Sequence, residues 1–175
     1  MTEINKEARL SEHLTSSSVA TLSHSSKLDG LRLSPHFTLG EMCKTRVKTT
    51  DGNIPSRVHI ENLKRVCRWL ERLRRRWNEL YGSGNDPIII NSGYRSPAVN
   101  KAVGGVSNSN HLTGCAADIR CRDKEQALRY AALLQDISDI EHEDYDEIII
   151  EKKATYWVHF AVRSTGNRKR TNLKR

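Results

Sequence analysis

One ten-residue segment in the second half of the chain constrains the fold more than any other feature. It follows the pattern S-x-H-x-x-G-x-A-x-D and runs from Ser109 through His111, Gly114 and Ala116 to Asp118. The small residues between the imidazole and the carboxylate suit a loop that turns into a strand, where both side chains would face one cation such as zinc. A histidine near an aspartate also occurs as a surface pair or a satisfied hydrogen bond, so the spacing alone leaves both interpretations open.

A zinc site needs a third protein ligand, because catalytic zinc is bound by three side chains and keeps one position open. The segment WVHF provides His159 within an alternating apolar strand pattern. We therefore predict a metal site formed by His111, Asp118 and His159. Cys115 is a further candidate within the loop, but the alternation of side chains along a strand turns it away from the other ligands.

The chain is basic, and its charge is unevenly distributed. Lysine and arginine outnumber aspartate and glutamate by 29 to 21, which gives +8, and the excess lies in residues 67–77 and 163–175. This balance favours acidic partners, which include nucleic acid, an anionic cell-wall polymer and a phospholipid surface, and it does not choose among them. For residues 67–77 we favour a solvated helix face over a nucleic-acid site, because the arginines lack the stacking aromatics of single-strand binders.

Neither a membrane span nor a secretory signal is predicted. No run approaches the roughly eighteen apolar residues of a membrane helix, and the N-terminus lacks a basic region followed by an apolar one. Cys43, Cys67, Cys115 and Cys121 show no C-x-x-C spacing, so we expect buried free thiols in a protein made in the cytoplasm. At 175 residues we expect one domain with a substantial core, and a monomer.

Composition divides the chain into three parts. Residues 1–29 are polar and serine-rich, so we expect a flexible arm with at most a short helix near Glu7 to Leu14. Residues 30–164 form the domain. Residues 165–175 are basic and contain glycine and asparagine, so we expect a disordered tail.

Within the domain, the apolar pattern predicts an α+β fold. A capping box of Thr38 and Glu41 begins a short helix, and steps of three and four residues predict further helices over 58–81, 97–103 and 123–134. Strands are predicted over 88–90, buried on both faces, and over 115–121, 146–152 and 156–162. We expect a small antiparallel sheet of three or four strands that carries the zinc site on one face, with two main helices packed behind.

The last two strands, DEIIIEK and YWVHFAV, are separated by a few polar residues and therefore predict a hairpin. In a symmetric hairpin that closes around Thr155, Glu151 lies directly across from His159. Cross-strand neighbours have Cβ atoms about 4.5–5.5 Å apart. The Glu151 carboxylate would then be close enough to reach water at a zinc ion.

Several stretches resemble the zinc D-alanyl-D-alanine carboxypeptidase family and, more closely, its subgroup of small phage- and bacterium-encoded peptidoglycan peptidases. They are LSPHFTLGEM, ENLKRVCRWLERLR, PIIINSGYRSPAVNKAVGGVSNSNHLTGCAADI and WVHF, and the resemblance covers about residues 31 to 163. It implies the small α+β zinc domain that this family shares with the hedgehog signalling domain. By motif, the family's zinc ligands fall on His111, Asp118 and His159.

The resemblance also implies residues that contact the substrate. Arg95 matches the arginine that the family uses to hold the substrate carboxylate or polarise its carbonyl, and a guanidinium can grip a carboxylate with two hydrogen bonds. A structural arginine at the end of a strand is the alternative. Ser109 matches a serine near the substrate, and Tyr94 of the same SGYRS segment as Arg95 is placed with the substrate-binding residues.

The general base is where the sequence departs from the better-known pattern of this family. Many members have a glutamate or aspartate three residues before the last histidine, but here that residue is Tyr156, which is no base at neutral pH. The close subgroup resembles I-I-x-E followed by W-x-H, which makes Glu151 the base. Asp146 and Glu147 are weaker candidates.

The sequence therefore predicts a zinc metallopeptidase that hydrolyses an amide bond in bacterial peptidoglycan stem peptides, as a D,D-carboxypeptidase or as an endopeptidase of the endolysin type. Without a signal, such a protein would reach the wall after phage lysis or through a pore. Two other functions stay open. The departure at Tyr156 permits a catalytically inert, zinc-binding cell-wall binding domain. The basic helix and tail permit a nucleic-acid-associated or virion protein, although no specific nucleic acid is expected.

Overall fold

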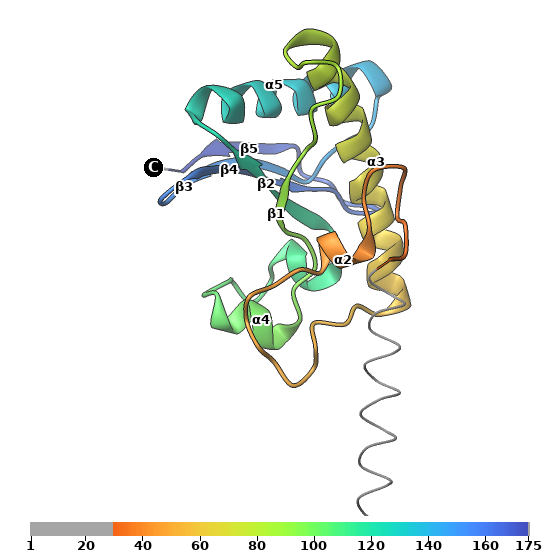
Figure 1. The fold of residues 1–175 in the computed structure, drawn as a ribbon, viewed down its shortest axis with the longest axis vertical. Coiled ribbons are helices and arrows are strands. Elements are labelled where there is room, and N and C mark those ends of the chain that lie inside the picture. The colour runs from red at the N-terminus through yellow and green to blue at the C-terminus, as the bar shows by residue number, and fades with distance from the viewer. Residues whose placement is uncertain (1–29, 175) are drawn as a thin grey trace, which may run out of the picture.

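A five-stranded sheet forms the centre of the computed structural model, which describes residues 30–174 (Figure 1). The strand order is β1-β2-β4-β3-β5, and neighbours are antiparallel except for β3 and β5, which are parallel. The strands are β1 (Ile90–Ser92), β2 (Ala116–Cys121), β3 (Glu147–Lys152), β4 (Tyr156–Ala161) and β5 (Arg170–Leu173). The predicted α+β class is confirmed, with a mostly antiparallel sheet.

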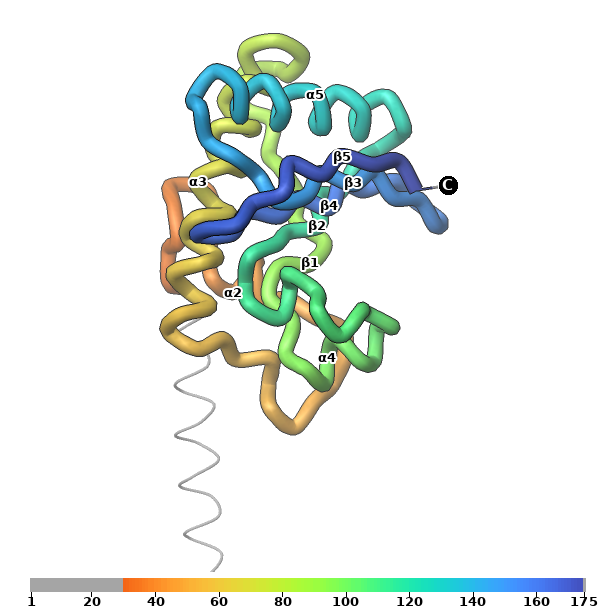
Figure 2. Tube along the Cα trace, turned by 180° about the vertical axis from the view of Figure 1, so that it is seen from behind, coloured from red at the N-terminus to blue at the C-terminus, as the bar shows by residue number. Residues whose placement is uncertain are grey.

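The helices lie on both sides of this sheet. Figure 1 shows α5 along one side of the sheet, with α4 and the 3-10 helix η1 on the other side, and Figure 2 shows the same layers from behind. The long helix α3 runs past both layers. The helical elements are α2 (Leu39–Met42), α3 (Arg57–Leu80), α4 (Pro97–Ala102), η1 (Asn110–Thr113) and α5 (Lys124–Glu141).

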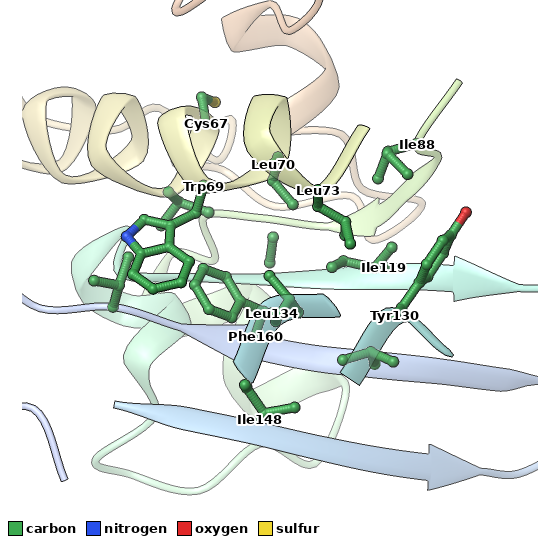
Figure 3. Close-up of a cluster of buried hydrophobic side chains, with 14 of the residues drawn as sticks. Cys67, Trp69, Leu70, Leu73, Ile88, Ile119, Tyr130, Leu134, Ile148 and Phe160 are labelled. Atoms are coloured by element: carbon green, nitrogen blue, oxygen red, sulfur yellow. The ribbon is translucent and has the colours of Figure 1, made fainter. Parts of the chain in front are cut away.

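The hydrophobic core lies between the sheet and the two long helices. Helix α3 buries one stripe of side chains at the predicted three- and four-residue steps, namely Leu63, Val66, Cys67, Trp69, Leu70, Leu73 and Trp77. Figure 3 shows Trp69 of α3 against Phe160 of β4, and their ring centroids are 5.2 Å apart. Each fully buried side chain of this size contributes about 1.5–3 kcal/mol. This packing fixes the strands and thereby the positions of the side chains on the opposite face of the sheet.

Two predicted elements differ from the structure within the domain, and a third agrees with it. The run at residues 88–90 is not a strand buried on both faces: β1 begins at Ile90, and Ile89 is 46% exposed. β1 lies at the edge of the sheet, and within residues 30–174 one of its sides has no neighbouring strand. Helix α5 extends beyond the predicted end at residue 134 and continues to Glu141. The capping box of Thr38 and Glu41 is present.

The prediction that residues 165–175 form a disordered tail is wrong for residues 170–173, which form strand β5. β5 pairs with β3, and backbone bonds continue to Lys174, whose N–H donates to Ile150 at 2.9 Å. Composition suggested disorder because the segment is polar and basic. The edge of β3 offers backbone partners, and neighbouring carboxylates neutralise the charge, as in the 3.2 Å ion pair of Lys169 with Asp144. The predicted arm over 1–29 lies outside the described residues.

The arginines of α3 are largely engaged with neighbours on the protein itself. Arg72 contacts Glu141 at 3.0 Å and Glu143 at 2.7 Å, and Arg76 contacts Glu79 at 2.9 Å. These contacts agree with a structural and solvated helix face. Across residues 30–174, every helix is too short or too polar to cross a membrane.

Candidate metal centre

Three side chains that can bind a metal converge where β2, β4 and η1 meet. Asp118 of β2 pairs directly with His159 of β4, and His111 lies on η1 just before β2. Nε2 of His111 is 3.2 Å from Oδ1 of Asp118 and 3.2 Å from Nδ1 of His159. The last two atoms are 2.9 Å apart. The fold therefore brings together the three predicted ligands, although His159 lies 41 residues after Asp118 in the sequence.

A short turn places His111 in this position. Oγ of Ser109 accepts from the backbone N–H of His111 at 3.3 Å and so caps η1 at its start. Gly114 ends η1 with φ of 72°, in the left-handed region that favours glycine. A Cβ at this position would lie 2.6 Å from the carbonyl oxygen of His59. The glycine of the motif therefore allows the turn to pass close to α3.

Each of the three candidate ligands has an outer partner that leaves one atom for a cation. Nδ1 of His111 lies 2.6 Å from the carbonyl of Gly93, which only accepts, so Nδ1 carries the proton and Nε2 is left as a ligand. Oδ2 of Asp118 accepts from Arg95, which leaves Oδ1. Nε2 of His159 lies 3.6 Å from Oε2 of Glu147, which leaves Nδ1. Such outer partners are typical of metal-binding histidines and carboxylates.

The donor set and its surroundings fit zinc. Zinc accepts histidine nitrogen and carboxylate oxygen, and a catalytic zinc has three protein ligands. The three ligand atoms lie within 4.8 Å of one another, and none of the described cysteines belongs to the group. Cys115, the further candidate, is instead directed to the carbonyl of Thr113 at 3.9 Å.

The charges of the group depend on one another. Burial alone would lower the pKa of His159, but its contacts with the carboxylates of Asp118 and Glu147 outweigh burial and raise the pKa to about 9. Burial alone would raise the pKa of Asp118, but the neighbouring histidines outweigh burial and hold it below its usual range. Asp118 is therefore ionised at neutral pH, and a cation bound at Nδ1 of His159 replaces a proton there.

The predicted register of the hairpin is wrong by two residues. Glu151 pairs with Trp157, and Ile149 is the residue that lies across from His159. Because side chains alternate along a strand, Glu151 still shares the face of His159. Glu147, at the start of β3, is on the same face and makes the closer contact with His159.

The metal-capable group opens into a cavity of about 530 Å³. Ser109, Arg95 and both glutamates of β3 line it, so the structure brings most of the predicted site residues together. Tyr94 is not among the lining residues: it is 5% exposed and stacks on the ring of His59 at 4.9 Å. Asp146 is fully buried behind the cavity and bonded to Arg168, so it is not placed to act as a base.

The cavity also contains residues that the sequence did not indicate. They come from the end of β4 onwards and are basic: Arg163, Arg168, Arg170 and Lys174. No sequence signal could have found them, because the polar, basic composition of this segment resembles that of a disordered tail.

The fold and these side chains define a protein with a candidate mononuclear metal centre, in which two imidazoles and one carboxylate face a polar cavity on a small α+β sheet. The chain belongs to the peptidase M15 family, whose model matches residues 35–159. The predicted family is thereby confirmed, while the phage subgroup stays a prediction. All three candidate ligands fall within the match.

A curated relative also supports a zinc peptidase family. A segment of 85 residues is 33% identical to the zinc D-Ala-D-Ala carboxypeptidase of Streptomyces albus G. The segment covers 48% of this chain and 31% of that protein, so the chain spans less than a third of the relative's length. The family and this relative imply zinc as the cofactor.

Proposed function

We propose that this protein is a zinc peptidase that hydrolyses an amide bond in the stem peptides of bacterial peptidoglycan. The observation that carries the proposal is the convergence of His111, Asp118 and His159, each with an outer partner, at the wall of a polar cavity. Membership of the peptidase M15 family and the similarity to a zinc D-Ala-D-Ala carboxypeptidase support both the metal and the substrate class.

Zinc bound at this site would supply Lewis acidity to the scissile carbonyl and to the attacking water. Glu151 is proposed as the base that takes the proton of this water and returns it to the leaving amine. It lines the cavity and has one cationic contact, Lys174 at 3.2 Å. Glu147 is a poorer base, because its oxygens already contact Arg168, Arg170, His159 and Asn110.

Arg95 is proposed to serve both the metal centre and the substrate. Its Nη2 donates to Asp118 and its Nε donates to Ser92 at 2.8 Å. Its Nη1 has no hydrogen-bond partner within residues 30–174, and the side chain lines the cavity. We therefore assign Nη1 to a substrate carboxylate or carbonyl oxygen. The hydroxyl of Ser109, which caps η1 and also borders the cavity, is proposed as a further contact with the peptide.

The test is the metal content of the purified protein together with the digestion of purified peptidoglycan. We expect about one zinc per chain in the wild type. His111→Ala and Asp118→Ala should lose the zinc and the hydrolysis together, whereas His36→Ala, a histidine outside the cavity, should retain both. Mass spectrometry of the products separates the two activities, because a carboxypeptidase releases free D-alanine and an endopeptidase releases larger fragments.

Two results would contradict the proposal. If the wild-type protein contained no zinc at neutral pH, the three side chains would not be a zinc site. Zinc without any release of stem-peptide fragments would favour an inert zinc-binding domain, and retention of the zinc-loaded protein on purified cell wall would identify it. The nucleic-acid alternative predicts DNA binding that falls steeply with salt concentration.

A further inference from the structure

The segment after β4 lies outside the family match, yet it forms part of the cavity wall. The match ends at residue 159, and β5 follows it at Arg170–Leu173. Figure 2 shows β5 along the edge of the sheet beside β3, and the two strands pair in parallel from Glu147 to Ile150. Residues that the family model does not describe are therefore attached to the strand that carries both cavity glutamates.

A buried carboxylate connects this segment to the metal centre. Asp146 is 0% exposed and accepts two hydrogen bonds from Arg168, at 2.8 Å from Nε and 2.7 Å from Nη2. Nη2 of Arg163 lies 3.1 Å from the same carboxylate. Asn110, the residue before the ligand His111, also donates to Asp146 at 2.8 Å. A two-point contact of this kind fixes the plane and direction of the Arg168 guanidinium.

The fixed guanidinium then reaches the next carboxylate along the strand. Nη2 of Arg168 lies 3.0 Å from Oε1 of Glu147, and Nη1 of Arg170 lies 3.3 Å from the same oxygen. The other oxygen, Oε2, is 3.6 Å from Nε2 of His159 and 3.2 Å from Nδ2 of Asn110. Arg168 thus spans Asp146 and Glu147 and holds one oxygen of Glu147 while the other faces the imidazole.

We propose that Arg168 is a positioning residue of the metal centre, which holds Glu147 against Nε2 of His159 so that Nδ1 of His159 is presented to the cation. The inference rests on the proposed function, because it requires that the cation is bound by His159. A carboxylate beside the outer nitrogen of a ligand histidine sets its tautomer and ring orientation. Without Arg168, the Glu147 side chain loses a charged partner and gains rotamers that no longer face His159.

The test measures zinc affinity rather than activity, by competition with a fluorescent zinc chelator on the full-length protein. Arg168→Ala and Glu147→Ala should each weaken zinc binding about 10–100-fold, as expected for the loss of an outer-shell partner. The matched control is Lys169→Gln, which removes the adjacent cation. Lys169 contacts Asp144 and Asp139 and does not line the cavity, so its zinc affinity should equal that of the wild type.

A double variant separates positioning from a general effect on the fold. If Arg168 acts through Glu147, Arg168→Ala should have little further effect on zinc affinity in the Glu147→Ala background. Arg168→Lys should restore the affinity only in part, because an ammonium cannot contact both carboxylates with the geometry of a guanidinium. The absorption bands of the cobalt-substituted protein should shift in Arg168→Ala, since they report the geometry at the metal.

The outcomes distinguish this inference from the proposed function. If Arg168→Ala unfolds, Arg168→Lys decides, because it keeps a cation beside the buried Asp146 but cannot contact Asp146 and Glu147 together as a guanidinium does. Zinc affinity of a folded Arg168 variant within about twofold of Lys169→Gln would overturn the positioning role and leave the peptidase proposal standing. The positioning role would also be overturned if Arg168→Ala lowered zinc affinity equally in the wild-type and Glu147→Ala backgrounds. A wild-type protein that binds no zinc would contradict both the positioning role and the proposed peptidase function.

Discussion

The two faces of the sheet use the same strands for opposite purposes. On the face that packs against α3 and α5, the strands present apolar side chains that are at most 5% exposed, namely Ala117, Ile119, Ile148, Ile150, Val158 and Phe160. Figure 3 shows part of this cluster with Trp69 and Leu134 from the helices. The residues between them on β2, β3 and β4 face the cavity, and they include Asp118, Glu147, Glu151 and His159.

The contrast shows how a small domain can support a polar site. Charged groups at the cavity face are held by hydrogen bonds and ion pairs from loops and from the strand edge, as with Asp118, which contacts Arg95 and both histidines. The opposite face needs no such partners, because dense apolar packing fixes the strands. Changes on one face should therefore affect chemistry and changes on the other should affect stability.

The largest expected effect tests the cavity face. Glu151→Gln should lower the rate of hydrolysis about 10²–10⁴-fold, because the amide cannot accept the proton of the attacking water. Zinc content and thermal stability should remain those of the wild type. Initial rates on a purified stem peptide measure the change, and Glu125→Gln on the exposed side of α5 is the matched control. Full activity in Glu151→Gln, with a Glu147→Gln protein that binds zinc but is inactive, would transfer the base role to Glu147.

Phe160 tests the comparison most directly, because it follows the ligand His159 in β4 but faces the core. Phe160 is 0% exposed and packs against Trp69, so Phe160→Ala should lower the free energy of unfolding by about 3–5 kcal/mol. Urea unfolding measures this loss, and the folded fraction should still bind zinc. Ile140→Ala, at a position 66% exposed, should change stability by less than about 0.5 kcal/mol. A Phe160→Ala protein that is stable but free of zinc would contradict the division between the two faces.

Glu71, a hydrogen-bonded glutamate outside the cavity, sharpens the comparison, because a carboxylate by itself does not define the site. Glu71 of α3 accepts from the hydroxyl of Ser34 at 2.6 Å and from the backbone N–H of His36 at 2.8 Å. Burial alone would raise its pKa, but these hydrogen bonds outweigh burial and hold the pKa below its usual range. Glu71→Gln should reduce the free energy of unfolding by about 1–2 kcal/mol at neutral pH without changing zinc affinity.

The same glutamate predicts a pH dependence. Because the pKa of Glu71 is lower in the folded state than in the unfolded state, its contribution is complete above about pH 4.5 and is lost as the pH falls through the folded-state value. The stability difference between wild type and Glu71→Gln should therefore shrink in acid. Urea unfolding at about pH 7 and about pH 3.5 measures it. A difference that grows in acid would contradict the assignment.

The smallest expected effect concerns a helix cap behind the core. Oδ1 of Asp123 accepts from the backbone N–H of Gln126 at 2.8 Å at the start of α5. Asp123→Ala should lower the free energy of unfolding by about 1 kcal/mol, and Asp123→Asn by less, since asparagine is also a good cap. Thermal unfolding measures both. Zinc affinity should be unchanged in each variant, and a change would show that α5 influences the cavity through the sheet.

Much of this protein follows from local patterns in its sequence. The period of two in CAADIRC and YWVHFAV determines which side chains of each strand share a face, so Asp118 and His159 could be expected on the face that carries the site. Their direct pairing across β2 and β4 came from the structure. The spacing around Ser109 and Gly114 predicted a turn that ends in a strand. These features are local, and each depends on the chemistry of a few neighbouring residues.

Only the tertiary structure decided the partners of the residues around the metal centre. The register of β3 on β4 depends on how the loop closes, and it places Ile149 rather than Glu151 across from His159. The strand β5 forms because the edge of β3 offers backbone groups and carboxylates to a segment that is polar by composition. Arg168 becomes part of the centre for the same reason. Such contacts join residues distant in the chain, and no local pattern encodes their distances.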